Sequence, residues 1–422
     1  MTKKNKLILT KPLLVFMGAM ILANIASRMY APLLALYIKE LGADIQEVGL
    51  FFTLSMIAPL FFQILGGWLS DSLGRLKAVA IGSIGGLMGF IVFMVAPTWH
   101  WLLLASITSS ISSSFVGPSF QAFIAEQSTE ENRGRIYGLT DAIFMIVGII
   151  GPIVGGYLSD GFGFKSMFMV AGILYAVATV IRIGMARNSH QAEKITPTRP
   201  TFSNLKISLA AMVGMVIGGG ILTWILISDG FRDIAFNMAF QFLPVYMQDL
   251  YGITKTQIGI ITAIGSAVTM VMLMPGGMLS DKKGERVGIV LGFMLIVGAM
   301  GLFLLSHSYL GFIISWSIFG VGEALIAPAY NSLISKVVPE KLRGTAFGLF
   351  TTSIGFISLP APYLGGILWD KFGPKFPFYV PMLTTLFLLP VMWKKFVLPP
   401  RNNKPEDVAV SHETVEIETP GA

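Results

Sequence analysis

The chain has 422 residues; 54% are hydrophobic and only 13% are charged, about half of the ~25% charged residues typical of soluble domains. Such a chain cannot cover a surface that faces water, so most of it must face lipid. This excludes a soluble enzyme, a disordered protein and a nucleic-acid binder, despite the net charge of +7. The sequence has no cysteine, and its four histidines fall in loops or in the tail without a pair at ligand spacing. We therefore expect no disulfide, no metal and no cofactor.

Apolar segments of about 20 residues predict transmembrane helices. The sequence contains twelve, at 12–37, 47–70, 76–96, 101–125, 135–159, 166–187, 221–247, 255–280, 287–306, 309–335, 344–368 and 377–397. They predict an all-α membrane protein. Residues 188–220 are expected to form a cytoplasmic linker, with an interfacial or buried helix over 205–217, and 398–422 a disordered cytoplasmic tail.

The positive charges predict the orientation of these helices. With the N-terminus inside, 23 of the 30 lysines and arginines fall in inner segments and five in outer loops. Cytoplasmic loops are enriched in these residues. We therefore expect both termini in the cytoplasm and a multi-pass protein of the cell membrane, in a bacterium the inner membrane.

An internal repeat divides the chain into two halves. Residues 117–163 align without gaps to 327–373, at an offset of 210 residues. A second offset, of 89 residues, relates the segment from Gly67 to Asp71 to the segment from Gly156 to Asp160. Because the second helix ends inside and the fifth ends outside, this inner repeat is inverted. Nested parallel and inverted repeats are typical of transporters that bind substrate near the bilayer midplane.

One loop motif resembles that of the major facilitator superfamily. After the second helix, the segment from Gly67 to Lys77 reads Gly-Trp-Leu-Ser-Asp-Ser-Leu-Gly-Arg-Leu-Lys. The matching motif residues are Gly67, Asp71, Gly74, Arg75 and Lys77, with a looser second copy at Gly277, Asp281, Gly284 and Arg286. The resemblance extends from residue 12 to 397. It implies two pseudo-symmetric six-helix bundles, 1–187 and 221–397, and a cytoplasmic latch in which Asp71 joins the second helix to the eleventh. The alternative is that these charges only fix the topology.

The fifth helix is similar to the glycine-rich motif of the twelve-helix drug:proton antiporters within that superfamily. The matching residues are Gly138, Gly148, Gly151, Pro152, Gly155 and Gly156. Val147 stands where the pattern has glycine, and ordinary small-residue packing is the alternative. Those antiporters also carry an arginine in the fourth helix, where this chain has a serine-rich stretch over 106–114. Coupling through that arginine is therefore absent.

Ionisable residues inside the predicted helices are candidates for function, because a charge in the bilayer is costly unless it has a role. The set comprises Arg28, Asp229, Arg232, Asp233 and Glu323, with Asp141 in the fifth helix. The resemblance implies that helices 1, 4, 7 and 10 line the central cavity, and these carry all of the set except Asp141. A carboxylate without a full cationic partner can hold a proton, so we expect the set to couple transport to protons. The alternatives are a static salt-bridge network and recognition of a charged substrate.

Polar and aromatic side chains are expected along the cavity wall. The candidates are Asn24, Tyr30, Gln121, Asn237, Gln241, Tyr330 and Asn331. Gln121 and Asn331 are 210 residues apart and are expected to face each other across the pseudo-twofold axis. Mostly apolar walls with a few amides suit a small amphipathic molecule.

These features together predict a monomeric secondary transporter in the lipid bilayer that exports small amphipathic molecules against protons by alternating access. The alternatives are proton-coupled uptake of a sugar or an organic acid, and a transporter-like sensor that moves no substrate. The sequence contains neither a phosphate-binding Gly-x-x-x-x-Gly-Lys loop nor a His-Glu-x-x-His motif, so we expect no enzyme activity.

Overall fold

The computed structural model describes residues 10–130, 132–188, 220–337 and 355–397, and within them the side chains of all but 63–73. The described residues are almost entirely helical. Eight helices among them are long and apolar enough to cross a membrane. The prediction of an all-α membrane protein is confirmed, whereas the linker, the helix over 205–217 and the tail lie outside the described residues.

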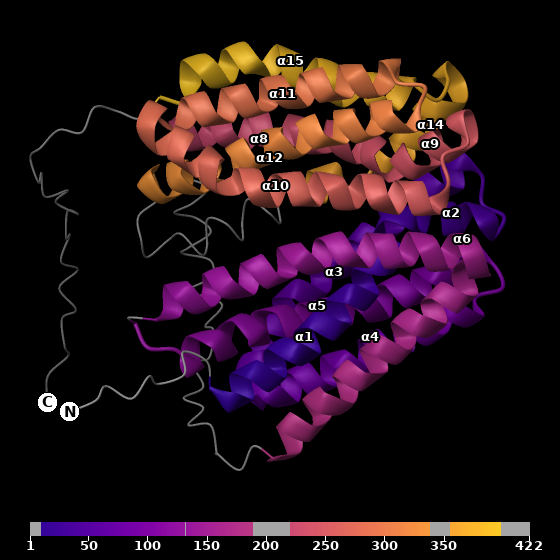
Figure 1. The fold of residues 1–422 in the computed structure, drawn as a ribbon, viewed down its shortest axis with the longest axis vertical. Coiled ribbons are helices and arrows are strands. Elements are labelled where there is room, and N and C mark those ends of the chain that lie inside the picture. The colour runs from indigo at the N-terminus through magenta and orange to yellow at the C-terminus, as the bar shows by residue number, and fades with distance from the viewer. Residues whose placement is uncertain (1–9, 131, 189–219, 338–354, 398–422) are drawn as a thin grey trace, which may run out of the picture.

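The first half of the chain forms one bundle (Figure 1). Its elements are α1 (Lys11–Tyr30), the short η1 (Ala31–Leu33), α2 (Leu34–Glu40), α3 (Ile45–Leu73), α4 (Arg75–Val95), α5 (Trp99–Gln127) and α6 (Arg133–Asn188). With 56 residues, α6 would be about 84 Å long if it were straight, more than twice the thickness of the hydrocarbon core. Gly163 breaks it with a φ of 81°, so α6 consists of two helical segments.

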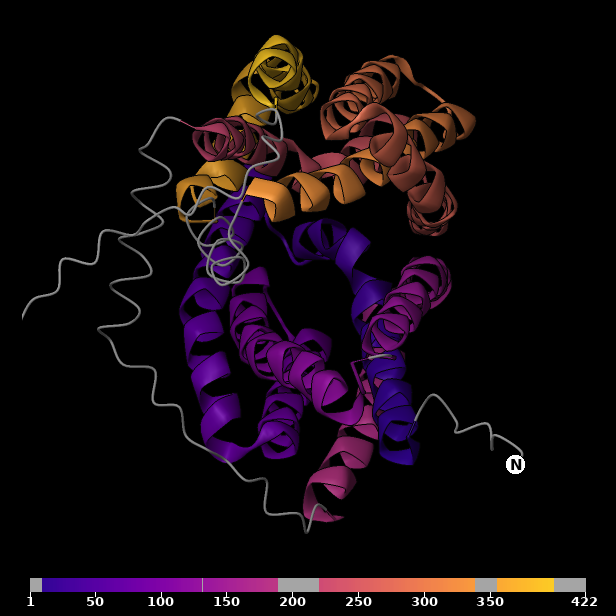
Figure 2. The ribbon, with the colours of Figure 1, turned by 90° about the vertical axis from the view of Figure 1, so that its left-hand side faces the viewer.

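The second half forms a bundle of the same kind. Its elements are α8 (Ile221–Ala239), η2 (Phe240–Phe242), α9 (Leu243–Tyr251), α10 (Lys255–Lys283), α11 (Glu285–Leu305), α12 (Tyr309–Val337), α14 (Ala361–Phe372) and α15 (Phe376–Lys395). Figure 2 views the molecule from the side on which α1 begins and shows the two bundles as separate groups of helices.

Four glycines at tight turns reproduce both sequence repeats. Gly74, Gly163, Gly284 and Gly373 have φ values between 81° and 96°, a region in which side chains beyond glycine are strained. Gly74 and Gly284 differ by 210 residues, as do Gly163 and Gly373, and the members of each half differ by 89. The same glycine turn therefore occurs at four equivalent places, between α3 and α4, inside α6, between α10 and α11, and between α14 and α15.

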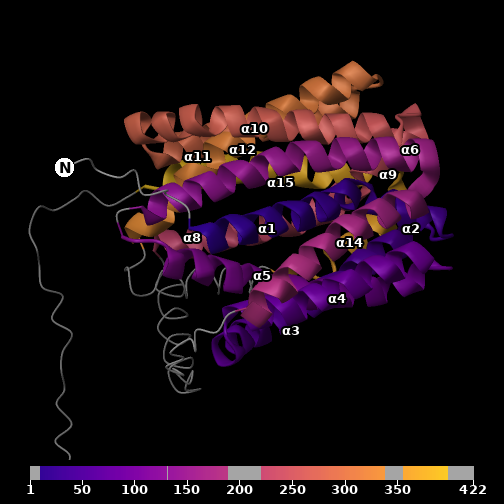
Figure 3. The same cartoon turned by 60° about the horizontal axis from the view of Figure 1, so that its bottom comes forward.

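The bundles meet at one end of the molecule, which we call the closed end. It contains α2, α9 and the first turns of α3 and α10. Across the interface α6 lies against α10 (Figure 3), and α3 lies against α14. One buried apolar cluster there draws residues from both bundles, including Tyr37, Phe168, Tyr246 and Phe378. At the opposite end each bundle has its own cluster. The bundles are therefore joined at the closed end and packed separately at the other.

Candidate functional site

A cavity of about 660 Å³ lies between the two bundles. We call it the central cavity. The first bundle contributes Arg28, Asp141 and Gly148 to its wall, and the second contributes Glu323 and Asn331, among others. A recess of about 540 Å³ in the second bundle adjoins it. The two spaces share lining residues from both bundles: Met145, Phe240, Thr269, Leu273, Phe319, Glu323 and Ala327. Glu323 thus lies where the central cavity and the recess join.

The three charged residues of α8 do not form one cluster. Arg232 pairs with Asp229, with 3.0 Å between Nη1 and Oδ1, and the Tyr330 hydroxyl donates to the same carboxylate oxygen at 2.9 Å. Asp233 instead accepts hydrogen bonds from Asn237 Nδ2 at 3.1 Å and from Ser358 Oγ at 2.7 Å. Asp229 therefore has a cationic partner, while Asp233 is held by neutral groups.

Glu323 has a different environment from either aspartate. It is exposed to the cavity, and the salt bridges among the described side chains do not include it, Arg28 or Asp141. These three groups line the same cavity without pairing. The recess beside Glu323 is mainly apolar, with Phe236, Phe293 and Phe319 among the residues in its wall.

The predicted polar lining is distributed over three spaces. Asn331 lines the central cavity and Asn237 the recess, while Asn24 and Tyr30 line a further cavity inside the first bundle. Tyr330 is buried against Asp229. Gln121 and Gln241 line none of these three spaces.

That Gln121 and Asn331 face each other across the pseudo-twofold axis therefore stays a prediction. The backbone carbonyl of Gln121 accepts a hydrogen bond from Tyr137 of α6, a helix of the same bundle, at 2.9 Å. Sequence separation by the repeat length gives equivalent places in the two bundles, and only residues near the pseudo-twofold axis can also be in contact.

Three glycines of the predicted helix-5 motif lie at close helix contacts. A Cβ on Gly151 would overlap the Cβ of Arg28, and one on Gly155 would overlap the carbonyl of Met29, both in α1. One on Gly156 would lie 2.6 Å from the carbonyl oxygen of Lys255 in α10. Gly138 and Gly148 meet nothing closer than 4.0 Å. Pro152 takes part as well, because its carbonyl lies against Gly259 of α10. The motif thus allows α6 to pack closely against α1 of its own bundle and against α10 of the other.

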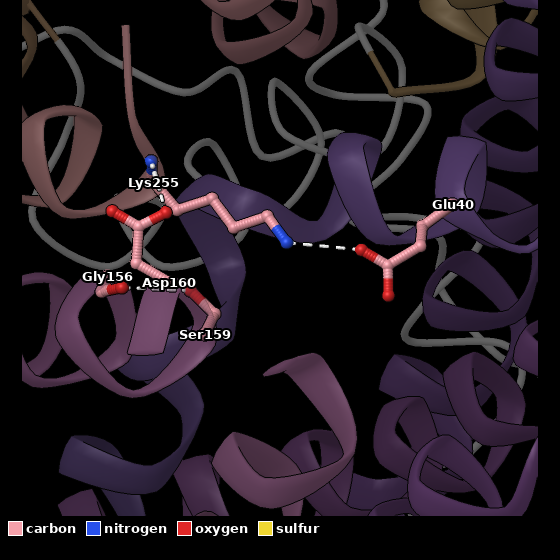
Figure 4. A network of polar contacts seen from close by, with 5 residues as sticks. All are labelled: Glu40, Gly156, Ser159, Asp160 and Lys255. Carbon is pink, nitrogen blue, oxygen red and sulfur yellow. Dashed lines mark hydrogen bonds and ion pairs between the residues drawn. The ribbon is translucent and has the colours of Figure 1, made fainter. Parts of the chain in front are cut away.

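Polar contacts cross between the bundles at the closed end (Figure 4). The carboxylate of Asp160 accepts hydrogen bonds from the backbone N–H groups of Lys255 at 3.3 Å and Thr256 at 3.1 Å, at the first turn of α10. The Lys255 ammonium reaches Glu40 at 3.1 Å. Beside them Lys39 forms an ion pair with Asp249, its own counterpart at an offset of 210 residues.

The predicted cytoplasmic latch is only partly within the described residues. Gly67 and Asp71 fall among the side chains outside the description, as does 338–354, where the partner helix would lie. Gly74 and Gly284 form the glycine turns, and Gly277 lies in α10. Arg75 pairs with Glu126 at 3.2 Å, and Arg286 donates to the Trp393 carbonyl at 3.2 Å. Lys77 and Asp281 are exposed.

Sequence reasoning missed Arg182, which is only 2% exposed and lines the cavity inside the first bundle. It lies near the end of the predicted segment 166–187 but is not among the ionisable residues that were predicted inside the helices. The available signal was an arginine inside the boundary of an apolar segment. The same reasoning missed Lys39 and Asp249, although opposite charges at the repeat offset stand in the sequence.

Two helical bundles related by an internal repeat, with a cavity between them that carries ionisable groups, define a multi-pass membrane transport protein. The model of the Major Facilitator Superfamily matches residues 16–232 and 225–417, so the chain belongs to this superfamily. The resemblance of the loop motif is thereby confirmed.

Two individual relatives are similar to this chain at modest sequence identity. The chain is 29% identical over 343 residues to a multi-drug resistance efflux pump PmrA homolog of Lactococcus lactis, covering 78% of this chain and 81% of the relative. It is 23% identical over 345 residues to the quinolone resistance protein NorA of Staphylococcus aureus, covering 80% and 85%. A solved D-xylose-proton symporter matches with a TM-score of 0.69 and 12% identity over 91% of this chain and 97% of that chain, a likeness of fold alone.

Proposed function

We propose that this transporter exports small amphipathic organic molecules in exchange for protons, by alternating access to the central cavity. The observation that carries the proposal is Glu323, a carboxylate at the junction of the cavity and the recess without an ion-pair partner among the described side chains. Relatives named as a multidrug efflux pump and a quinolone resistance protein support export over uptake.

The walls of the recess suit the apolar part of such a molecule. Phe236, Phe240 and Phe319 form a chain of ring contacts, with centroids 4.9 Å and 5.4 Å apart along it. Aromatic surfaces with a few polar groups bind amphipathic ligands without requiring one fixed geometry. Asn237 and Thr269 supply hydrogen-bonding groups at the edge of this surface.

Glu323 is the proposed carrier of the proton. When the cavity faces the outside, Glu323 takes up a proton as substrate leaves; when it faces the cytoplasm, the proton leaves and substrate binds. Ionisable groups that line a pathway inside the membrane commonly act as such relays. Each cycle then moves one substrate outward and one proton inward, and Arg28 and Asp141 adjust the charge of the cavity.

The charge bias of the loops supports cytoplasmic termini, and we assign the closed end to the outside on this basis. The molecule described here would then be closed to the outside and open toward the cytoplasm. We further propose that it works as a monomer in the cell membrane.

The inverted repeat supports the proposed latch at Asp71. Asp160, its counterpart at an offset of 89 residues, accepts two backbone N–H groups at the first turn of α10. A carboxylate is favoured at such a helix N-terminus. Asp71 would make the equivalent contact at the cytoplasmic end when the transporter opens to the outside.

The test uses everted membrane vesicles with an acidic lumen and a panel of cationic, neutral and anionic amphipathic dyes. We expect wild-type protein to concentrate at least one dye inside the vesicles, in proportion to the pH gradient. Glu323→Gln should abolish this accumulation but retain exchange of dye down its own gradient, because exchange needs the cavity but no titrating group. Asp233→Asn is compared in parallel, since Asp233 is held by neutral groups.

Accumulation that needs an alkaline lumen would contradict export and favour proton-coupled uptake. If Glu323→Gln and Asp233→Asn both concentrate dye with unchanged pH dependence, neither residue carries the proton. A protein that binds the dyes but moves none would be a sensor and not a transporter.

A further inference from the structure

A cavity of about 440 Å³ lies inside the first bundle, apart from the central cavity. It is enclosed by α1, α4, α5 and α6. Its polar lining comes from Asn24 and Ser27 of α1, from the serine-rich stretch of α5, and from Tyr175 and Arg182 of α6; Phe90 and Val116 add apolar surface. We call it the first-bundle cavity.

The repeat places this cavity at the same position in its bundle as the recess holds in the second. Residues that line the two spaces correspond at the offset of 210: Ser27 to Asn237, Tyr30 to Phe240, Gly86 to Ile296, Ser109 to Phe319, Ser113 to Glu323 and Val116 to Ile326. Two of the serines thus correspond to a phenylalanine and to the carboxylate in the second bundle. The same space exists twice, once hydroxyl-rich and once aromatic with an acid.

Arg182 gives the first-bundle cavity an unbalanced positive charge. The lining contains no aspartate or glutamate, and Arg182 forms no salt bridge with the described side chains. Its Nη1 donates to the Ser83 hydroxyl at 3.0 Å, its Nη2 contacts the thioether of Met20, and its Nε has no hydrogen-bond partner. The guanidinium carbon also lies 5.8 Å from the centre of the Tyr175 ring, a neutral neighbour. A thioether is a weak acceptor, so a guanidinium with five N–H groups is poorly satisfied.

A buried charge in this condition is costly, and an anion beside it would remove the cost. The space is far larger than an inorganic ion needs, and its wall mixes hydroxyls with Tyr30 and Phe90. One positive charge matches a single negative charge on the ligand.

We propose that the first-bundle cavity is an anion subsite in which Arg182 binds the carboxylate of an amphipathic organic acid or zwitterion. The proposal rests on the proposed function, and it narrows the substrate class to molecules with one carboxylate and an apolar body. Asn24 and Ser113 of the lining can donate hydrogen bonds to the head group, and the apolar body extends past Tyr30 and Phe90.

The test measures equilibrium binding to purified full-length protein in nanodiscs, without any gradient. The probes are 1-naphthaleneacetic acid, ionised at neutral pH, and its neutral carboxamide. We expect the wild-type protein to bind the acid at least about tenfold more tightly than the amide, which corresponds to ~1.4 kcal/mol. Arg182→Gln should remove this preference by weakening the acid alone, and Arg182→Lys should restore part of it.

Two controls separate the subsite from a structural arginine. Arg187→Gln changes an exposed arginine on the same helix and should bind both probes as the wild-type protein does. Thermal melting of Arg182→Gln should match or exceed that of the wild type, because an unpaired buried charge has been removed. A large loss of melting temperature with equal loss of both probes would identify Arg182 as a brace and overturn the proposal.

A second variant serves if Arg182→Gln does not fold. Asn24→Asp places a carboxylate in the cavity, where it neutralises Arg182, and should also abolish the preference for the acid. Equal binding of acid and amide by the wild type would overturn the proposal. Binding of chloride alone as tightly as the acid would also overturn it. Because no proton gradient is involved, this result is independent of whether transport is proton-coupled.

Discussion

Asp229 and Glu323 are two carboxylates of one transporter with different surroundings. Asp229 shares its oxygen with Arg232 and Tyr330, and the Arg232 guanidinium lies 4.4 Å from the centre of the Phe293 ring. These contacts link α8, α11 and α12. Glu323 has no such ties among the described residues. We infer that Asp229 braces the second bundle and leaves proton exchange to Glu323.

Asp229→Asn should therefore destabilise the protein. Removing the carboxylate leaves Arg232 charged in a buried site without its salt-bridge partner, which costs about 3–5 kcal/mol in comparable cases. Tyr330→Phe removes one hydrogen bond and should cost ~1–3 kcal/mol. Thermal melting in detergent measures both, and Asp229→Asn/Arg232→Gln should recover part of the loss. Wild-type melting with a shifted pH dependence of transport would instead assign a titrating role to Asp229.

At this scale the sequence predicted the pair but not the choice of partner. The spacing of Asp229, Arg232 and Asp233 allows either aspartate to meet the arginine. The choice depends on Tyr330 and Ser358, which are distant in the chain. Arg182 could not be recognised as buried without the packing of α6 against α1, which brings it to Met20.

Helix ends are where the internal repeat has its clearest physical effect. Asp44 begins α3 and Thr254 begins α10, 210 residues apart, and each forms a capping box with the residue three positions later. At α10 the carboxylate of Asp160, from the other bundle, adds hydrogen bonds to the first turn. A helix N-terminus thus contributes to holding the two bundles together.

Asp160→Asn should weaken the closed end without unfolding either bundle. The cap of a helix is worth about 0.5–2 kcal/mol, so the ratio of closed to open molecules should change by several-fold. Asp370→Asn is the matched control, because Asp370 is the repeat counterpart and has no hydrogen bond to the described residues. A cysteine at Ser266, in the central-cavity wall, reports opening through its labelling rate from outside. Equal rates in both variants would contradict the assignment.

The order and approximate limits of the helices followed from hydrophobic length, and the repeats predicted which segments correspond. The breaks at η1 and η2 were not predicted. They lie at nearly equivalent places in the two halves; Pro32 is the middle residue of η1, and Pro244 is in the first turn of α9, directly after η2. A proline inside an apolar run is weak evidence by itself because membrane helices tolerate it. The close packing of Gly156 on α10 also depends on which helices face each other, which composition does not encode.

At the scale of the whole molecule, the two bundles share one core at one end and have separate cores at the other. The sequence predicted two pseudo-symmetric halves but gave no information on which end is closed, because hydrophobic length and repeat offsets do not determine which helix ends pack together. The ion pair between Lys39 and Asp249 joins the two bundles. Two residues equivalent by a pseudo-twofold can touch only near its axis, so this pair marks the axis at the closed end.

Lys39→Asp should open the closed end, because it replaces an attraction across the axis by repulsion between two carboxylates. Exposed ion pairs are worth up to about 1 kcal/mol and like charges cost a similar amount, so opening should increase roughly tenfold. Labelling of a cysteine at Ser266 by an impermeant reagent on intact cells should rise accordingly. The swapped variant Lys39→Asp/Asp249→Lys should return to the wild-type rate, since attraction is restored with reversed sign.

Lys165→Asp is the matched control: it makes the same change of charge near the glycine turn of α6, on an exposed lysine that forms no salt bridge with the described side chains. It should leave labelling unchanged. A rise in labelling that the swapped variant does not reverse would mean that net charge, and not the pair, controls opening. If Lys39→Asp instead increases labelling only in everted vesicles, the closed end faces the cytoplasm and the assigned orientation is wrong. The labelling rate therefore reports on contact between the two bundles, because Lys39 belongs to the first half of the chain and its partner Asp249 belongs to the second.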